Sequence, residues 1–225
     1  MYLSANQPPK AKEMSMSFTP ARYQPLTAKS SANWEPRQVL LFSGHMIDAP
    51  NRNPPRFPAE KVPQVAEAIK QSLDELKTGP LDLALTQGAN GGDILFAEVC
   101  LKRGVHLQLL QPFAEPQFIE NSVATAAEDW LNRYQSITAT IQQPPLAAPA
   151  ELGELPPNMN PYERCNLWLL DTALAYGAEK LTFICLWDGG GGDGPGGTAH
   201  MLEEVKKRQG RVVWLDTRAM FKIND

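Results

Sequence analysis

The sequence predicts an α/β domain with a mainly parallel sheet of about five or more strands. Two observations carry this prediction. From residue 37 onwards, short apolar runs alternate with longer segments of helical periodicity, and the apolar runs are continuous instead of alternating with polar residues. Strands that helices cover on both faces have this continuous apolar character, and strands separated by helices pair in parallel. We therefore expect a three-layer, Rossmann-like domain over residues 37–225.

Each expected element follows from its local pattern. The strands are short apolar runs, at residues 37–44, 81–88, 105–113, 180–187 and 211–217. The helices repeat apolar residues every three to four positions, at residues 59–79, 89–104, 115–137, 160–177 and 197–209. The fourth helix has the clearest start, because Asn160 suits the N-cap position and Pro161 suits the first helical position.

Two segments fall outside this pattern. Residues 1–36 are rich in Pro, Ser and Lys and have neither periodicity, so we expect a disordered or loosely packed tail. Residues 142–160 contain five prolines and no period. We expect a long loop there, and long loops in compact domains are often functional.

Composition narrows the classes of partner. The net charge is −4 and the pI is about 5.5, which argues against nucleic acid, because phosphate contacts need clustered Lys and Arg. The three cysteines are widely spaced and lie in apolar segments, so we expect buried reduced thiols in a cytoplasmic chain. No apolar run approaches the ~20 residues that span a bilayer, so we expect no membrane contact. Neither a cofactor nor a metal site is indicated.

The candidate ligand site lies where the strands end. Parallel sheets bind ligands at the carboxyl ends of their strands, and two glycine-rich turns leave that edge and enter helices. Glycine lets backbone N–H groups approach an anion at the positive end of a helix. The candidate ligand-binding residues at this edge are Gly44, His45, Gly88, Gly91, Gly92, Asp93, Asp188, Gly194, Gly196, Gly197 and Thr198.

The familiar phosphate motifs fit this edge poorly. A P-loop needs a Lys where Gly197 stands. The glycine run also matches GxGxxG, with Asp216 about 20 residues further on, so a dinucleotide fingerprint stays an alternative. Carboxylates crowd the edge, and the cationic candidates are Arg52, Arg56 and Arg164. A ribose-phosphate ligand would use both sets, with hydroxyls on Asp and phosphate on Arg and glycine N–H groups.

Four stretches resemble the SLOG superfamily, a Rossmann-like group that includes LOG phosphoribohydrolases and molybdenum-cofactor carrier proteins. They are "LFSGHMID", "QGANGGDILFAEVCLKRGVHLQLLQPF", "NPYERCN" and "GPGGTAHMLEEV", and the resemblance covers roughly residues 37–217. The most similar branch is associated with signalling. The resemblance implies a module that senses a nucleotide or an NAD-derived ligand. It also implies dimers formed through helices, for which the apolar stripe around Trp130 and Tyr134 is a candidate surface.

The resemblance to LOG enzymes implies an alternative function, cleavage of a nucleotide N-glycosidic bond. Their P-G-G-x-G-T-x-x-E motif aligns without a gap from Pro195, which places Glu203 on the catalytic Glu, and Arg164 resembles the assisting arginine of the preceding helix. The resemblance implies that Glu203 stabilises the ribose cation or activates water while Arg164 holds the phosphate. The chain departs from the motif, because Ala199 and His200 stand where Gly and Thr are expected. Aligned on the threonine, Met201 takes the Glu position. This ambiguity concerns catalysis more than binding.

Overall fold

The computed structural model describes residues 18–21, 34–126, 129–191 and 196–222. One six-stranded sheet has the order β4-β3-β2-β1-β5-β6, and every strand pair is parallel. Its strands are β1 (Val39–Gly44), β2 (Leu83–Thr86), β3 (His106–Gln111), β4 (Leu146–Ala147), β5 (Leu181–Trp187) and β6 (Arg211–Asp216). The central strands are almost wholly buried, which explains why their sequences are continuously apolar.

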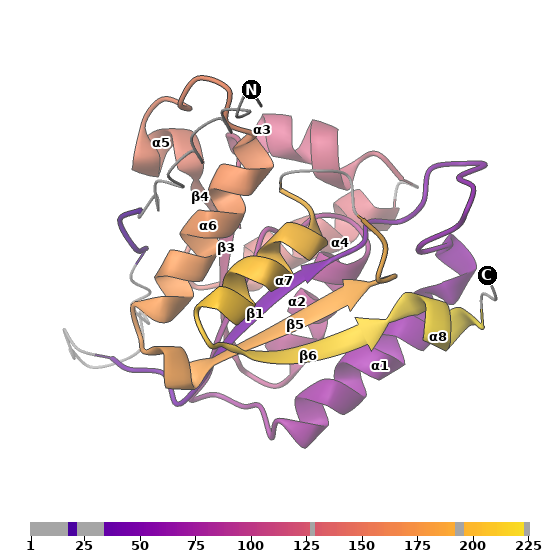
Figure 1. Ribbon diagram of the computed structural model, residues 1–225, viewed down its shortest axis with the longest axis horizontal. Helices are drawn as coiled ribbons and strands as arrows, with labels where there is room; N and C mark the ends of the chain where they lie inside the picture. The colour runs from indigo at the N-terminus through magenta and orange to yellow at the C-terminus, as the bar shows by residue number, and fades with distance from the viewer. Residues whose placement is uncertain (1–17, 22–33, 127–128, 192–195, 223–225) are drawn as a thin grey trace, which may run out of the picture.

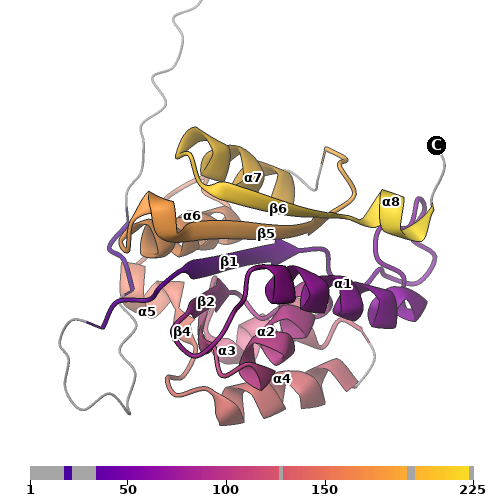
Figure 2. The same cartoon turned by 90° about the horizontal axis from the view of Figure 1, so that it is seen from below.

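Helices cover both faces of this sheet (Figures 1 and 2). One face carries α1 (Val62–Glu75), α2 (Gly92–Lys102) and α4 (Asp129–Thr140); the other carries α6 (Pro161–Leu174) and α7 (Thr198–Lys207). Each face encloses its own apolar core, with Phe96 in the first and Trp168 in the second. The three-layer, Rossmann-like α/β fold is thereby confirmed.

The direction of the chain across the sheet reverses at β1. Strands β1, β2 and β3 follow one another outward, and α6 then returns the chain to β5 on the other side of β1. The loops that leave β1 and β5 therefore diverge onto opposite faces of the sheet. A crevice for ligands forms at such a switch point in parallel sheets.

The helix expected at 115–137 is broken in the structure. It divides into α3 (Glu115–Phe118), the π-turn η2 (Ile119–Val123) and α4. The reason is a contact from a distant loop: the Asn90 side-chain amide donates to the carbonyl oxygens of Ser122 and Val123. Because these carbonyls are bound by Asn90, the break is fixed, and Ser122 is buried at the sheet edge.

The proline-rich segment 142–160 is more ordered than a long loop. Its residues form β4, which pairs with β3 at the edge of the sheet, and the short helix α5 (Ala148–Leu152). Arg164 on α6 holds this segment, because its guanidinium donates to the carbonyl oxygens of Ala148, Gly153 and Glu154 at 2.7–2.8 Å. The remaining short helices are η1 (Ala59–Lys61), η3 (Ala178–Lys180) and α8 (Thr217–Phe221).

A described part of the expected tail is docked on α6. The backbone N–H of Phe18 donates to the Asp171 carboxylate at 2.8 Å, and the Trp168 indole donates to the carbonyl oxygen of Thr19 at 3.1 Å. The rest of residues 1–33 lies outside the described residues. Cys100, Cys165 and Cys185 are all free and buried, as expected. None of the described helices is both long and apolar enough to cross a membrane.

Candidate functional site

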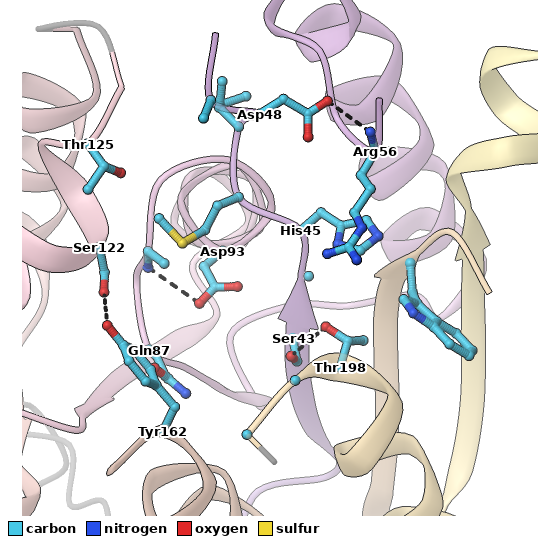
Figure 3. A pocket seen from close by; sticks show the side chains of 18 of the residues that line it. Ser43, His45, Asp48, Arg56, Gln87, Asp93, Ser122, Thr125, Tyr162 and Thr198 are labelled. Carbon is cyan, nitrogen blue, oxygen red and sulfur yellow. Dashed lines mark hydrogen bonds between the residues drawn. The ribbon is translucent and has the colours of Figure 1, made fainter. Parts of the chain in front are cut away.

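A cavity of about 370 Å³ opens at the carboxyl ends of β1, β2 and β5, beside the switch point (Figure 3). The residues that line it include six of the expected ligand residues: Gly44, His45, Asp93, Gly196, Gly197 and Thr198. The two cationic candidates from the loop after β1, Arg52 and Arg56, also line it. The cavity thus lies at the edge predicted from the sequence.

The glycines of the turn after β2 do not line the cavity, although Gln87, Ala89 and Asp93 beside them do. Gly91 has a φ of +85°, and a Cβ there would lie 2.8 Å from the carbonyl oxygen of His45. The N–H of Gly92 donates to that same oxygen at 3.0 Å, and Asn90 Oδ1 accepts from the N–H of Ile47. Gly88, Gly91 and Gly92 were expected as ligand residues. Gly91 and Gly92 bring the loop after β2 against the loop after β1, whereas Gly88, with a φ of +89°, donates its N–H to Asp93.

The backbone N–H groups of the glycine turn after β2 bind a carboxylate of the protein itself, that of Asp93. Oδ2 of Asp93, in the first turn of α2, accepts the N–H groups of Gly88 at 3.2 Å and Ala89 at 3.4 Å. Burial raises the pKa of Asp93 to about 6, against the opposing effect of the Thr86 hydroxyl and of the backbone N–H groups. In Figure 3 the second carboxyl oxygen points into the middle of the cavity. Asp93 therefore presents one oxygen to whatever fills the cavity.

The second glycine segment keeps its backbone toward the cavity. Gly197 is the N-cap of α7 and has no side chain to cap the first turn. Gly196 has a φ of +95°, and a Cβ there would lie 2.7 Å from the Glu163 backbone nitrogen, so only glycine fits against α6. Asn166 fixes this turn by donating to the carbonyl oxygen of Gly196 at 2.7 Å. Gly194 lies outside the described residues.

His45 and Asp188 link the loops that leave β1 and β5. The backbone N–H of Asp188 donates to His45 Nε2 at 3.0 Å, so Nε2 is an acceptor and the ring proton is on Nδ1. Burial lowers the pKa of His45 and outweighs the nearby Asp188 carboxylate, whose Oδ1 lies 3.3 Å from Nε2. The imidazole is therefore neutral near pH 7.

Asp188 supports two cavity residues and does not itself line the cavity. Its carboxylate lies 3.7 Å from Arg56 Nε as well as beside His45. Burial acts to raise the pKa of Asp188, but the N–H of Gly190, His45 and Arg56 together lower it below its usual value. The expected ligand residue Asp188 is thus an ionised group behind His45 and Arg56.

Asp48 positions the loop that carries the two cationic residues of the cavity, Arg52 and Arg56. Its Oδ2 accepts the backbone N–H groups of Arg56 at 2.8 Å and Phe57 at 2.9 Å, and its Oδ1 lies 3.6 Å from Arg52 Nε. These contacts fix the loop after β1, from which both Arg52 and Arg56 line the cavity; Figure 3 shows the Arg56 side chain there.

Three hydroxyl-bearing residues of the cavity were missed from the sequence: Ser122, Thr125 and Tyr162. The Ser122 and Tyr162 hydroxyls lie 3.0 Å apart, and Asn90 Nδ2 donates to Thr125 Oγ1 at 2.7 Å. Ser122 lies within η2 and Thr125 lies just beyond it, so both come from the break in the helix. The one available signal was Tyr162, which directly follows the predicted start of α6.

Arg164 and Glu203, expected to be catalytic, are not among the residues that line the cavity. Arg164 is buried against the carbonyls of the 146–154 segment, and Glu203 is exposed on the outer face of α7. Met201, which takes the Glu position in the other alignment, is buried in the core. Trp130 and Tyr134 are also buried, so they offer no dimer surface.

The described residues define the chain as an α/β protein of the Rossmann-like class with a polar, charged cavity at its switch point. No protein-family model matches the sequence, and no curated protein matches it significantly.

Proposed function

We propose that the chain binds a nucleotide or an NAD-derived ligand in this cavity, through its ribose phosphate, and that it acts as a sensor module. The observation that carries the proposal is that groups able to bind a phosphate and a group able to bind a sugar lie in the same cavity. Two arginines and the first turn of α7 lie in the same cavity as one buried carboxyl group, that of Asp93. A cavity of about 370 Å³ also lies within the range of small-molecule sites.

The phosphate has two sets of donors. The backbone N–H groups of the first turn of α7 begin at Gly197 and Thr198, and the positive end of the helix dipole favours an anion there. Arg56 and Arg52 add guanidinium groups, which bind phosphate oxygens in pairs. These are the only Lys or Arg side chains that line the cavity among the described residues.

The ribose has a matching acceptor. Sugar hydroxyls donate hydrogen bonds, and the inward oxygen of Asp93 is an acceptor when the carboxyl is ionised. Burial raises the Asp93 pKa to about 6, so this oxygen is mainly ionised at pH 7.5. A bare phosphate would be repelled at this point, whereas a sugar hydroxyl is attracted.

The SLOG resemblance supports the same reading. Of its four stretches, "LFSGHMID" supplies Ser43, Gly44 and His45, and "GPGGTAHMLEEV" supplies Gly196 and Thr198, all of which line the cavity. The alternative, a LOG-like phosphoribohydrolase, has less support, because Glu203 is exposed and Arg164 is bound to backbone carbonyls. Binding without hydrolysis is therefore the function we favour.

Thermal-shift measurements with ribose 5-phosphate, AMP and NAD test this proposal, with mass analysis of each mixture after incubation. We expect stabilisation by at least one of these ligands and no free base. Release of free adenine from AMP, or of nicotinamide from NAD, would favour the hydrolase instead. Absence of any shift at millimolar ligand would count against binding itself.

A further inference from the structure

The cavity is polarised, with charge on one side of Asp93 and neutral polar groups on the other. Figure 3 shows His45 and Arg56 on one side of Asp93, and Thr125, Ser122 and Tyr162 on the opposite side. Gln87 lines the cavity as well. The neutral side carries hydroxyl and amide groups but no charged side chain among the described residues. We call Gln87, Ser122, Thr125 and Tyr162 the neutral wall.

A relay of hydrogen bonds orients the Gln87 amide. The carbonyl oxygen of Gly196 accepts only, so the Asn166 amide must turn its Nδ2 toward it, at 2.7 Å. Asn166 Oδ1 then faces Gln87 and accepts from Gln87 Nε2, also at 2.7 Å. This contact uses one of the two Gln87 Nε2 hydrogens and fixes which end of the amide is Oε1, an acceptor with no partner among the described residues.

The hydroxyl groups of the neutral wall have O–H hydrogens that the hydrogen bonds within the protein do not use. Thr125 Oγ1 accepts from Asn90 Nδ2, so its own O–H remains to be donated. Ser122 and Tyr162 share one hydrogen between their two oxygens, which leaves the second O–H available. The neutral wall thus presents two hydroxyl donors and, from Gln87, an amide of fixed orientation with Oε1 as acceptor and one remaining N–H.

We infer that the neutral wall recognises the base of the bound nucleotide, and that Gln87 Oε1 selects a base with an exocyclic amino group, as in adenine. This inference rests on the proposed function and adds the orientation of the ligand: phosphate toward Arg56 and α7, ribose at Asp93, base at the neutral wall. Adenine offers an amino donor to Gln87 and ring nitrogens as acceptors for the hydroxyls. Hypoxanthine, with an oxygen in place of the amino group, would set two acceptors against each other.

The test is calorimetric titration of the full chain with AMP, IMP and ribose 5-phosphate, which lacks a base. We expect AMP to bind roughly tenfold or more tightly than IMP. In Gln87→Leu the two affinities should become equal, while the affinity for ribose 5-phosphate stays unchanged. Gln71→Leu, on the exposed face of α1, is the matched control and should keep the preference. Gln87→Met, which is closer in shape, serves if the Leu variant does not fold.

Equal affinities of the wild-type chain for AMP and IMP would overturn the inference, and so would a preference that survives in Gln87→Leu. In both cases binding of ribose 5-phosphate would leave the proposed function standing. Failure of AMP, IMP and ribose 5-phosphate alike to bind would overturn the proposed function and this inference with it. The two failures are therefore distinguishable.

Discussion

The backbone N–H of Asp188 donates to Nε2 of His45 across 3.0 Å and joins the loop after β5 to the loop after β1. These loops leave neighbouring strands, since Gly44 of β1 pairs with Leu186 of β5. The contact holds the two loops together beside the cavity. It also fixes the protonation state of His45, because a ring nitrogen that accepts from an N–H carries no proton.

The first prediction concerns His45. Burial lowers its pKa, so NMR titration should give a midpoint below 6.5 and a neutral ring with its proton on Nδ1. Because the folded state then binds this proton less readily than the unfolded state, His45 should reduce stability as pH falls below 6.5. Asp188→Asn removes a carboxylate that raises the His45 pKa, so its midpoint should be lower still. A midpoint above 6.5 in the wild type would contradict this account.

The second prediction concerns Asp93. Its pKa is about 6 in the folded state against 3.8 as the usual value, so the folded state holds the proton more tightly. Stability attributable to Asp93 should therefore fall as pH rises from about 4 to 6, by on the order of 3 kcal/mol. Asp93→Asn should be more stable than the wild type at pH 7.5 and should lose that advantage at pH 4. Chemical denaturation at both pH values measures this, and a variant less stable at pH 7.5 would oppose it.

The third prediction concerns Gly91. Alanine there must adopt a φ of +85° and place its Cβ 2.8 Å from the carbonyl oxygen of His45. We expect Gly91→Ala to lose about 2–4 kcal/mol of unfolding free energy. Gly79→Ala is the control, because a Cβ at Gly79 meets nothing within 4 Å and should change stability little. Equal stability of the two variants would mean that the loops after β1 and β2 do not meet as described.

The fourth prediction concerns Arg164. Three backbone carbonyls of the 146–154 segment lose their donors in Arg164→Met, so we expect a loss of on the order of 2–4 kcal/mol. Hydrogen exchange should increase in β4 and α5 before it increases elsewhere. The affinity for ribose 5-phosphate should stay within a few-fold of the wild type. Loss of affinity without loss of stability would return Arg164 to the ligand site.

The fold could be predicted because its strands are buried on both faces. Their sequences are therefore continuously apolar, which distinguishes them from strands that face solvent on one side. The sequence also placed His45, Asp93 and Thr198 at the sheet edge, since residues that follow parallel strands meet there. The role of Arg164 could not be predicted. An arginine on a helix can contact a ligand or a neighbouring segment, and the tertiary packing that decides between them leaves no signal in the local sequence. Ser122 and Thr125 were missed for the same reason: a distant side chain, Asn90, breaks their helix.

The central claim is that the cavity binds a ribose phosphate through Arg56. Calorimetric titration with ribose 5-phosphate tests it most directly, with Arg56→Ala compared to Arg211→Ala, which removes the same charge at an exposed end of β6. The account predicts measurable binding by the wild type and by Arg211→Ala, and on the order of tenfold or weaker binding by Arg56→Ala. Unchanged affinity in Arg56→Ala, with the protein folded, would contradict it.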